Sequence, residues 1–515
     1  MPEISNPILP GFHPDPSLCR VGDDFYLVTS SFSFYPGLPV FHSRDLVHWE
    51  QLGHVIDRPD MLRLNSRRLS GGLWAPTIRW HDGLFYVICT HSEGSGDFVC
   101  TAENPAGPWS DPVYIDGAPG IDPSLFWDED GSCWMTGNDW SKGYCYLWAC
   151  RLDDRSFRLL GEPKELWRGA LKDAHAPEAP HLYRKDGYYY LLIAEGGTEF
   201  FHAVTVARSE HVLGPYAGYP GNPILTHRHM GRTAEIACTG HADLVELRDG
   251  SWYMACLACR PVEGYHLILG RETFLAPVSW ENGWPVVHPG VGRLTLSVPA
   301  PALPPHPFPP ADPDDWRSPV WNQLGCGEGS AVAVQGKELR LRCAAAPLIP
   351  RDALETPVPL AFYGRRVQSP SFHSRVNVAL PAREGASCGL VVLQNHYHAL
   401  RAELVRKSPE TVLLRCVRSW FDKVSKSYCG QPCYEEELSA GTGPYGAVLS
   451  LAAEGLRYTF SHNGSPLPPA DASFLGSETA GGYIGAYVGL FASGNGRDLP
   501  DEAVFTDFRY AAPAE

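Results

Sequence analysis

The sequence predicts an all-β protein, in which a five-bladed β-propeller is followed by a concanavalin-like β-sandwich. Three observations support this prediction. A short motif occurs five times before residue 300, helical periodicity is nearly absent, and a proline-rich stretch separates the repeats from the rest of the chain. Short alternating runs of apolar and polar residues, interrupted by Gly, Pro, Asn and Asp, are typical of strands joined by tight turns.

The repeated motif has a small or acidic first residue, an aliphatic anchor three positions later, a polar turn and then an aromatic-rich strand. Its copies begin at Asp15, Ala75, Asp122, Ala179 and Ala242. The anchors are spaced by 60, 47, 57 and 63 residues. Periods of roughly 40–50 residues with several short strands per period indicate a propeller. Five copies therefore predict five blades.

The starts of the five copies should meet, because the first strand of each propeller blade lies nearest the axis. Three carboxyl groups stand at these starts, in Asp15, Asp122 and Glu178, together with Trp74 and His241. An Asp before Pro often only shapes a turn. Turn formation alone does not explain why acids recur at equivalent positions in three copies of the repeat. We therefore predict that the three acids form one site.

The bulk composition excludes some classes of partner. The net charge is −16, from 42 basic and 58 acidic residues, which argues against nucleic acid and anionic membranes. No signal peptide is visible at the N-terminus, and no apolar run reaches membrane-spanning length. The 15 cysteines match no disulfide framework. We therefore expect free thiols and a cytoplasmic location.

The chain divides at a proline-rich connector, residues 299–313, which should be extended and semi-rigid. We predict a propeller over residues 1–305 and a sandwich over residues 306–515. The expected sandwich strands are Glu338–Cys343, Arg375–Leu380, Gly389–Leu393, Thr411–Val417, Ala447–Ala452, Tyr483–Leu490 and Phe505–Tyr510.

Three carboxyl groups at the mouth of an all-β channel suit glycoside hydrolysis. One carboxylic acid protonates the leaving oxygen, while a carboxylate activates water or attacks the sugar. Acids on different blades are held apart, which favours inversion, with carboxyl groups roughly 6.5–9.5 Å apart. The third acid can raise the pKa of a neighbour.

Several motifs together resemble glycoside hydrolase family 43, in the branch of β-xylosidases and α-L-arabinofuranosidases that carry a C-terminal sandwich. They are Gly11–Ser17, Thr29–Gly37, Trp74–Pro76, Gly120–Ser124, His175–Pro180, Gly240–Asp243 and Gly270–Thr273. The resemblance covers the whole propeller and, more weakly, the sandwich. It implies that Asp15 is the general base and Glu178 the general acid, and that Asp122 positions the acid and raises its pKa.

The resemblance also implies residues that bind the sugar. Phe32 and Trp74 would form walls of the pocket, Arg271 would bind sugar hydroxyls, and Thr198 would line the pocket. His241 would contact the substrate or, in some members of the family, a metal ion through water. From the sandwich, we expect Tyr487 to lend an aromatic side chain to the site.

The predicted activity is inverting, exo-acting release of terminal xylose or arabinofuranose from short plant-cell-wall oligosaccharides. The sequence leaves three alternatives: a dedicated α-L-arabinofuranosidase or arabinanase, a non-catalytic carbohydrate-binding propeller, and a structural scaffold. We expect no cofactor and no catalytic metal, the alternative being a structural calcium ion near His241. The expected partner is a small oligosaccharide, and we expect no binding to nucleic acid or to a membrane. The sequence does not decide whether the chain forms a homo-oligomer.

Overall fold

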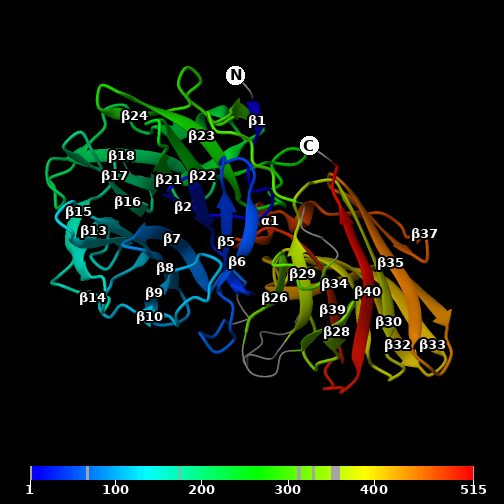
Figure 1. Cartoon of the computed structure of the whole chain (residues 1–515). Helices are drawn as coiled ribbons and strands as arrows, with labels where there is room; N and C mark the ends of the chain where they lie inside the picture. Colours follow the sequence, from blue (N-terminus) through cyan, green and yellow to red (C-terminus); the bar gives the residue numbers. More distant parts are fainter. Residues whose placement is uncertain are drawn as a thin grey trace.

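The computed structural model describes residues 3–64, 69–172, 175–309, 315–326, 331–349 and 360–513. In this part of the chain, five antiparallel sheets are arranged around one axis, and two larger sheets stack beside them (Figure 1). The predicted fold class, a five-bladed propeller with a β-sandwich, is confirmed.

Each blade is formed by one continuous stretch of the chain. Blade one contains β2 (Ser17–Val21), β3 (Asp24–Val28), β5 (Gly37–Ser43) and β6 (Glu50–Ile56). Blade two contains β7 (Leu73–His81), β8 (Leu84–His91), β9 (Gly96–Ala102) and β10 (Val113–Tyr114). Blade three contains β11 (Ile121–Trp127), β12 (Cys133–Asp139), β13 (Tyr146–Asp153), β14 (Arg158–Leu159) and β15 (Lys164–Trp167).

The last two blades follow the same plan. Blade four contains β16 (Glu178–Lys185), β17 (Tyr188–Glu195), β18 (Ala203–Ser209), β19 (Ala217–Gly218) and β20 (Leu225–Thr226). Blade five contains β21 (Ala237–Glu246), β22 (Trp252–Cys259), β23 (Glu272–Glu281) and β24 (Trp284–Val287). Outside the blades, β1 (Glu3–Ser5) pairs with β25 (Ser297–Pro299).

The repeated motif forms the first hairpin of each blade. Its turn residues explain why: Asp82 and Gly83 have φ of 46° and 86°, and Asp186 and Gly187 have 50° and 82°. Two successive residues with positive φ form the tight turn that suits twisted antiparallel strands, and Asp-Gly tolerates it. The first strands of the blades contact one another in the closed order β2, β7, β11, β16, β21 and again β2.

The sandwich consists of two stacked antiparallel sheets with an apolar core between them. One sheet has the order β34 (Ser427–Ser439), β33 (Thr411–Asp422), β32 (Ala399–Ser408), β31 (Ser387–Leu393), β39 (Tyr487–Ser493), β29 (Ala361–Arg366), β26 (Trp321–Leu324) and β4 (Phe34–Tyr35). The other has the order β27 (Val332–Gln335), β28 (Glu338–Arg342), β40 (Glu502–Ala511), β30 (Phe372–Leu380), β35 (Tyr445–Glu454), β36 (Arg457–His462) and β37 (Ser465–Pro466), with β38 (Ala470–Asp471) beside β36.

One strand boundary differs from the prediction in a way that matters for the site. The expected strand over Tyr483–Leu490 begins only at Tyr487, and residues 481–486 form no strand. Gly481 and Gly482 have φ of 77° and 86°, a conformation that glycine adopts without strain but that ends a regular strand. Tyr483 therefore lies on a loop, between the short helix α1 (Ser477–Ala480) and β39.

Propeller and sandwich share a sheet and an apolar core. The short β4, from the propeller sequence, pairs with β26 of the sandwich. The ring of Phe34 stacks on that of Tyr487, with centroids 3.9 Å apart. Arg366 of β29 donates from Nε to the carbonyl oxygen of Phe12 at 2.6 Å. These contacts hold the sandwich against the propeller.

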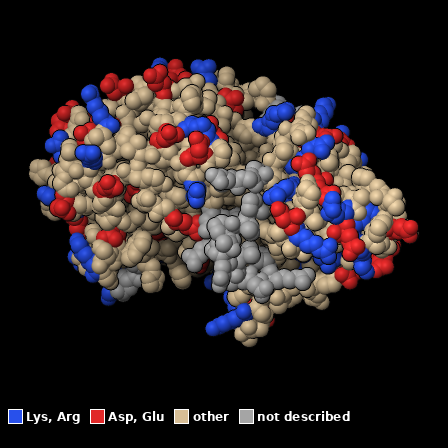
Figure 2. Space-filling model, turned by 90° about the horizontal axis from the view of Figure 1, so that it is seen from below, with Lys and Arg blue, Asp and Glu red and all other residues tan. Residues whose placement is uncertain are grey.

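The described part of the connector runs along blade one. The backbone N–H of His306 donates to Oδ2 of Asp45 at 2.7 Å, and the ring of Phe308 packs against that of His42. On the face shown in Figure 2, acidic and basic side chains are interspersed over both the propeller and the sandwich. All 15 cysteines are free thiols. In the described part of the chain, no helix is long and apolar enough to cross a membrane.

Candidate active site

A cavity of about 420 Å³ lies at one end of the propeller axis. All five blades line it, and the sandwich contributes Tyr483. The lining residues are Asp15, Phe32, Trp74, Ala75, Ile121, Asp122, His175, Ala176, Glu178, Gly196, Gly197, Thr198, Glu199, Phe201, His241, Arg271 and Tyr483. The three predicted carboxyl groups are thus brought together in one concave site.

A local backbone irregularity recurs where the inner strands meet the cavity. Residues in the left-handed region stand there in every blade: Asp15 (φ 55°), Ala75 (45°), Asp122 (56°), Ala179 (53°) and His241 (43°). The pairing of β7, β11, β16 and β21 with the next strand shifts register at the same places. Such bulges re-aim side chains near active sites. They turn the carboxyl groups toward the cavity.

Asp15 is held as a carboxylate. Arg271 donates from Nη1 to its Oδ1 at 2.8 Å, and Ser30 donates from Oγ to its Oδ2 at 2.6 Å. Nδ1 of His241 lies 3.6 Å from Oδ1. Burial alone would raise the pKa of Asp15, but the charge of Arg271, with His241 and Ser30, outweighs it and lowers this pKa below its ordinary value.

Glu178 and Asp122 form a pair that retains a proton. They stand on the neighbouring inner strands β16 and β11. Burial and the negative charge of Asp15 raise the pKa of Glu178 to about 7, against the opposing effect of Arg271. Burial and the charges of Glu178, Asp15 and Asp97 raise the pKa of Asp122 well above its ordinary value. One site therefore contains an ionised carboxylate and a protonated pair.

Aromatic side chains form one wall of the cavity. The rings of Phe32 and Trp74 lie 6.3 Å apart, and Tyr483 meets Trp74 edge-on at the same distance. Trp74 is oriented by a hydrogen bond from Nε1 to the carbonyl oxygen of Ser70. Arg271 connects this wall to Asp15, because its Nη1 also donates to Oγ1 of Thr198 and its Nη2 to the carbonyl oxygen of Tyr483.

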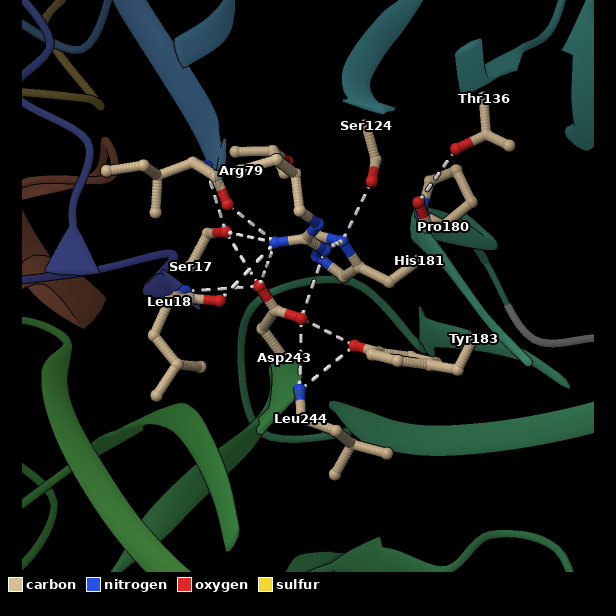
Figure 3. A network of polar contacts seen from close by, with 12 residues as sticks. Ser17, Leu18, Arg79, Ser124, Thr136, Pro180, His181, Tyr183, Asp243 and Leu244 are labelled. Atoms are coloured by element: carbon tan, nitrogen blue, oxygen red, sulfur yellow. Dashed lines mark hydrogen bonds and ion pairs between the residues drawn. The ribbon is translucent and has the colours of Figure 1, made fainter. Parts of the chain in front are cut away.

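A polar network fills the axis beyond the carboxyl groups (Figure 3). Arg79 pairs with Asp243 at 2.7 Å and donates to Nδ1 of His181 at 3.0 Å. Ser17 donates to Asp243, and Ser124 contacts His181. These residues come from the inner strands of all five blades and follow the cavity residues along them. The network closes the axis, so the cavity ends there.

Comparisons with known proteins agree with this geometry. The family model "Glycosyl hydrolases family 43" matches residues 4–285, and the model "Beta xylosidase C-terminal Concanavalin A-like domain" matches residues 321–511. A xylosidase/arabinosidase of Butyrivibrio fibrisolvens is 40% identical, over 98% of each chain. A non-reducing end alpha-L-arabinofuranosidase of Bacteroides ovatus is 38% identical, over 98% of this chain and 94% of that protein.

The chain belongs to glycoside hydrolase family 43. The solved structure "Bacteroides ovatus Xyloglucan PUL GH43B" superposes on this family-43 enzyme with a TM-score of 0.89 and 33% identity, covering 99% of this chain and all of that one. A xylan beta-1,4-xylosidase structure from Bacillus halodurans gives a TM-score of 0.88 at 32% identity, with 99% and 100% covered. The predicted family and glycoside hydrolase activity are confirmed.

Eight of the nine site residues predicted for this family-43 enzyme line the cavity. Tyr487 does not, and that prediction is wrong. Its side chain is fully buried between the two parts of the enzyme, stacked on Phe34. The sandwich residue at the cavity is Tyr483, four positions earlier. The neighbouring Gly481 and Gly482 were the signal that this segment is a loop rather than a strand.

The sequence reasoning also missed the residues at one side of the cavity mouth. His175, Glu199 and Phe201 belong to the two loops that flank Glu178 and β17. The backbone N–H of Gly196 donates to the carbonyl oxygen of His175, which ties these loops together. Phe201 is 62% exposed although it lines the cavity. Nothing in its sequence context distinguishes this phenylalanine from a core residue.

Proposed function

We propose that this family-43 enzyme is an inverting, exo-acting glycosidase that releases terminal xylose or arabinofuranose from short oligosaccharides. One observation carries the proposal: a cavity of about 420 Å³ ends at the axis network and presents an ionised Asp15 opposite a protonated pair, Asp122 and Glu178. Ligand sites of roughly 300–1,000 Å³ enclose small molecules, so this one suits a single terminal sugar.

The acids take their roles from their charge states. Asp15, with its lowered pKa, is ionised and acts as the general base that takes a proton from water. Glu178, with a pKa of about 7, carries the proton that the leaving oxygen needs. The charge of Glu178 is one cause of the raised pKa of Asp122, so the two carboxyl groups hold a proton between them above the ordinary pH range of a carboxyl group. Next to the base, Arg271 donates hydrogen bonds to the sugar hydroxyls, and the Thr198 hydroxyl can donate to them or accept from them.

Inversion is supported by the positions of the base and the acid around the axis. Asp15 precedes β2, and Glu178 opens β16, whereas the neighbours of β2 in the closed ring are β7 and β21. At least one inner strand therefore separates the two carboxyl groups on either side. An inverting enzyme needs such a separation, because water must fit between the base and the sugar.

The choice of sugar rests on the relatives. Their names specify xylosidase/arabinosidase, arabinofuranosidase at the non-reducing end and beta-xylosidase, and the last comes from Bacillus subtilis at 31% identity over 99% of both chains. An arabinanase that cuts within a chain would need an open cleft, whereas here Tyr483 and the axis network bound the cavity. A propeller that only binds carbohydrate does not require a proton donor such as Glu178.

The experiment is to digest xylo- and arabino-oligosaccharides and follow the first-formed sugar by NMR. The expected product is a monosaccharide with the anomeric configuration opposite to that of the substrate. Release of internal fragments would contradict exo action, a retained configuration would contradict inversion, and no hydrolysis of any pentoside would favour the binding propeller.

We also propose that the hydrolysis needs no metal. Among the described residues, no three or more His, Cys, Asp or Glu side chains are grouped to hold a metal ion. The cavity residues that resemble ligands, His241 and Asp15, already contact each other, and Asp15 also accepts a hydrogen bond from Arg271. Full activity after dialysis against a chelator is expected. Loss of activity that one divalent cation restores would overturn this proposal and point to an ion near His241.

A further inference from the structure

A fourth carboxyl group stands close to the acid pair but outside the cavity lining. Asp97 lies on β9 of blade two, and its side chain is 1% exposed. Its Oδ1 accepts a hydrogen bond from Oγ1 of Thr90, on β8, at 2.7 Å. Its Oδ2 is buried and has no hydrogen-bond partner within the described residues. Burial of an acid at such a cost calls for a role.

Thr90 connects Asp97 to the acid pair. Oγ1 of Thr90 accepts the backbone N–H of Asp122 across 3.2 Å, from blade two to blade three. A hydroxyl group has one proton and two lone pairs. The Thr90 hydroxyl donates its one hydrogen bond to Asp97. Its lone pairs therefore remain free to accept a hydrogen bond from the backbone N–H of Asp122. The carboxyl group of Asp97 thus fixes which way the Thr90 hydroxyl points.

The bond to Asp122 acts where the backbone is strained. Asp122 has φ of 56°, a left-handed conformation that is unfavourable for most residues with a Cβ. Such conformations persist only where the surroundings impose them. A second hydrogen bond, from the backbone of Ala179 to the Asp122 carboxyl group, ties the same residue to the strand that carries Glu178.

Blade one contains the same hydrogen-bond arrangement, but there the hydroxyl donates to a different carboxyl group. Oγ of Ser30 accepts the backbone N–H of Ala75, which also has positive φ, at 2.7 Å. The Ser30 hydroxyl donates to Asp15, the base itself. In blade two the corresponding hydroxyl, that of Thr90, donates its hydrogen bond to Asp97, which does not line the cavity. The recurrence indicates that a hydroxyl oriented by a carboxyl group sets the next blade's bulge.

We propose that Thr90 and Asp97 are positioning residues that hold Asp122 in its left-handed conformation and thereby align the Asp122–Glu178 pair. The inference rests on the proposed function, because it assigns the two residues a role through Asp122. Neither residue is part of the cavity lining.

Asp97 also brings a charge that depends on pH. Burial raises its pKa to about 7, against the lowering effect of the Thr90 hydrogen bond. The titratable groups that face it are Asp122 and Cys89, and no basic side chain pairs with it among the described residues. Above neutral pH its negative charge opposes deprotonation of Asp122, one member of the acid pair. Asp97→Asn keeps an acceptor for Thr90 but removes this charge. The alkaline limb of the variant enzyme's pH profile should therefore shift to lower pH.

The test compares Thr90→Val with Thr90→Ser and with Thr226→Val. Valine has the shape of threonine without the hydroxyl, serine keeps the hydroxyl, and Thr226 is a matched control on the outer β20, whose hydroxyl bonds the carbonyl of His202. Misplacement of a catalytic group by about 1 Å costs on the order of 10²-fold in rate, so we expect Thr90→Val to lower kcat by about tenfold to a hundredfold. KM should change little, and the serine variant should restore kcat.

Several outcomes would overturn the proposal. They are an unchanged kcat in Thr90→Val, a loss no larger than in Thr226→Val, and a KM that rises as kcat stays constant. Asp122→Asn is measured in parallel: if it keeps full activity, the proposed function itself fails, whereas an impaired Asp122→Asn beside an unaffected Thr90→Val rejects only this inference. If Thr90→Val does not fold, the pH profile of Asp97→Asn decides, since an unshifted alkaline limb contradicts the proposal.

Discussion

Arg271 and Asp15 form a buried ion pair in the lining of the cavity, with Nη1 and Oδ1 2.8 Å apart. The same nitrogen donates to Thr198, and the other terminal nitrogen reaches the backbone of Tyr483. One side chain thus sets the charge of the base and connects the propeller to the sandwich.

Replacing this arginine should change the acid side of the pH profile. Arg271 lowers the pKa of Asp15, and the base must be ionised to accept a proton. In Arg271→Met, the pKa of Asp15 rises, so activity should disappear at a higher pH as the solution is acidified. The measurement is kcat/KM against pH on an aryl glycoside. An acid limb at the wild-type position would contradict it.

The two main acids should respond differently to the leaving group. Asp15→Asn removes the base that every substrate needs, so the loss should be about 10²–10⁴-fold for all leaving groups. Glu178→Gln removes only the proton donor. It should be badly impaired on disaccharides yet partly active on a dinitrophenyl glycoside, whose phenolate leaves without a proton. Equal losses on every leaving group would refute the assigned roles.

The alkaline limb of the pH profile of activity should reflect deprotonation of the Asp122–Glu178 pair. Glu178 has a pKa of about 7, so activity on disaccharides should fall as the pH rises above that value. In Glu178→Gln this limb should flatten, because no proton remains to be lost. Azide should not rescue either acid variant by trapping a sugar, since an inverting enzyme forms no covalent intermediate. A glycosyl azide in the product mixture would argue for retention.

The exposed ring of Phe201 should affect the leaving sugar. It lines the same cavity as Glu178, the proposed proton donor to the oxygen of the departing group. Stacking on an aromatic ring contributes about 0.5–1.5 kcal/mol, so Phe201→Ala should lower kcat/KM on disaccharides by roughly twofold to twelvefold. A glycosyl fluoride has no leaving sugar and should be unaffected. Trp80→Ala, at the far end of β7, is the matched control with another exposed aromatic residue.

The ion pair on the axis should govern stability in acid. Burial would raise the pKa of Asp243, but Arg79 and His181 lower it below its ordinary value. A depressed folded-state pKa contributes stability above the unfolded value of about 3.9, and that contribution is lost as the pH falls through the folded-state value. Arg79→Met leaves a buried charge unpaired and should cost about 3–5 kcal/mol in the free energy of unfolding at neutral pH. Denaturant titrations at pH 7 and pH 3 test this: a cost that does not shrink on acidification would contradict it.

The propeller was predictable because each blade repeats the same local chemistry. Asp82-Gly83 and Asp186-Gly187 require one kind of turn, and the spacing from anchor to aromatic residue identifies the hairpin. The convergence of Asp15, Asp122 and Glu178 followed from the repeat alone. Their opposite pKa shifts did not, because these depend on which inner strands are neighbours and on where Arg271 points.

The sandwich was harder to read, because its strands pair over long distances in sequence. β26 pairs with β4, almost 290 residues away, and no local pattern marks Phe34–Tyr35 as part of that sheet. The error at Tyr487 has the same origin. Its alternating neighbours predict a strand that starts early, whereas two glycines with positive φ delay it and leave Tyr483 at the cavity.

The position of Tyr483, 212 residues after Arg271, has a consequence for synthesis. Domains fold from the N-terminus as a chain emerges from the ribosome, and each blade here is one continuous stretch. The carboxyl groups can therefore assemble while translation continues, but Arg271 gains its bond to the Tyr483 carbonyl only when the 212 residues up to Tyr483 have been made. A nascent enzyme thus holds its acids in place before its sugar pocket has its final wall.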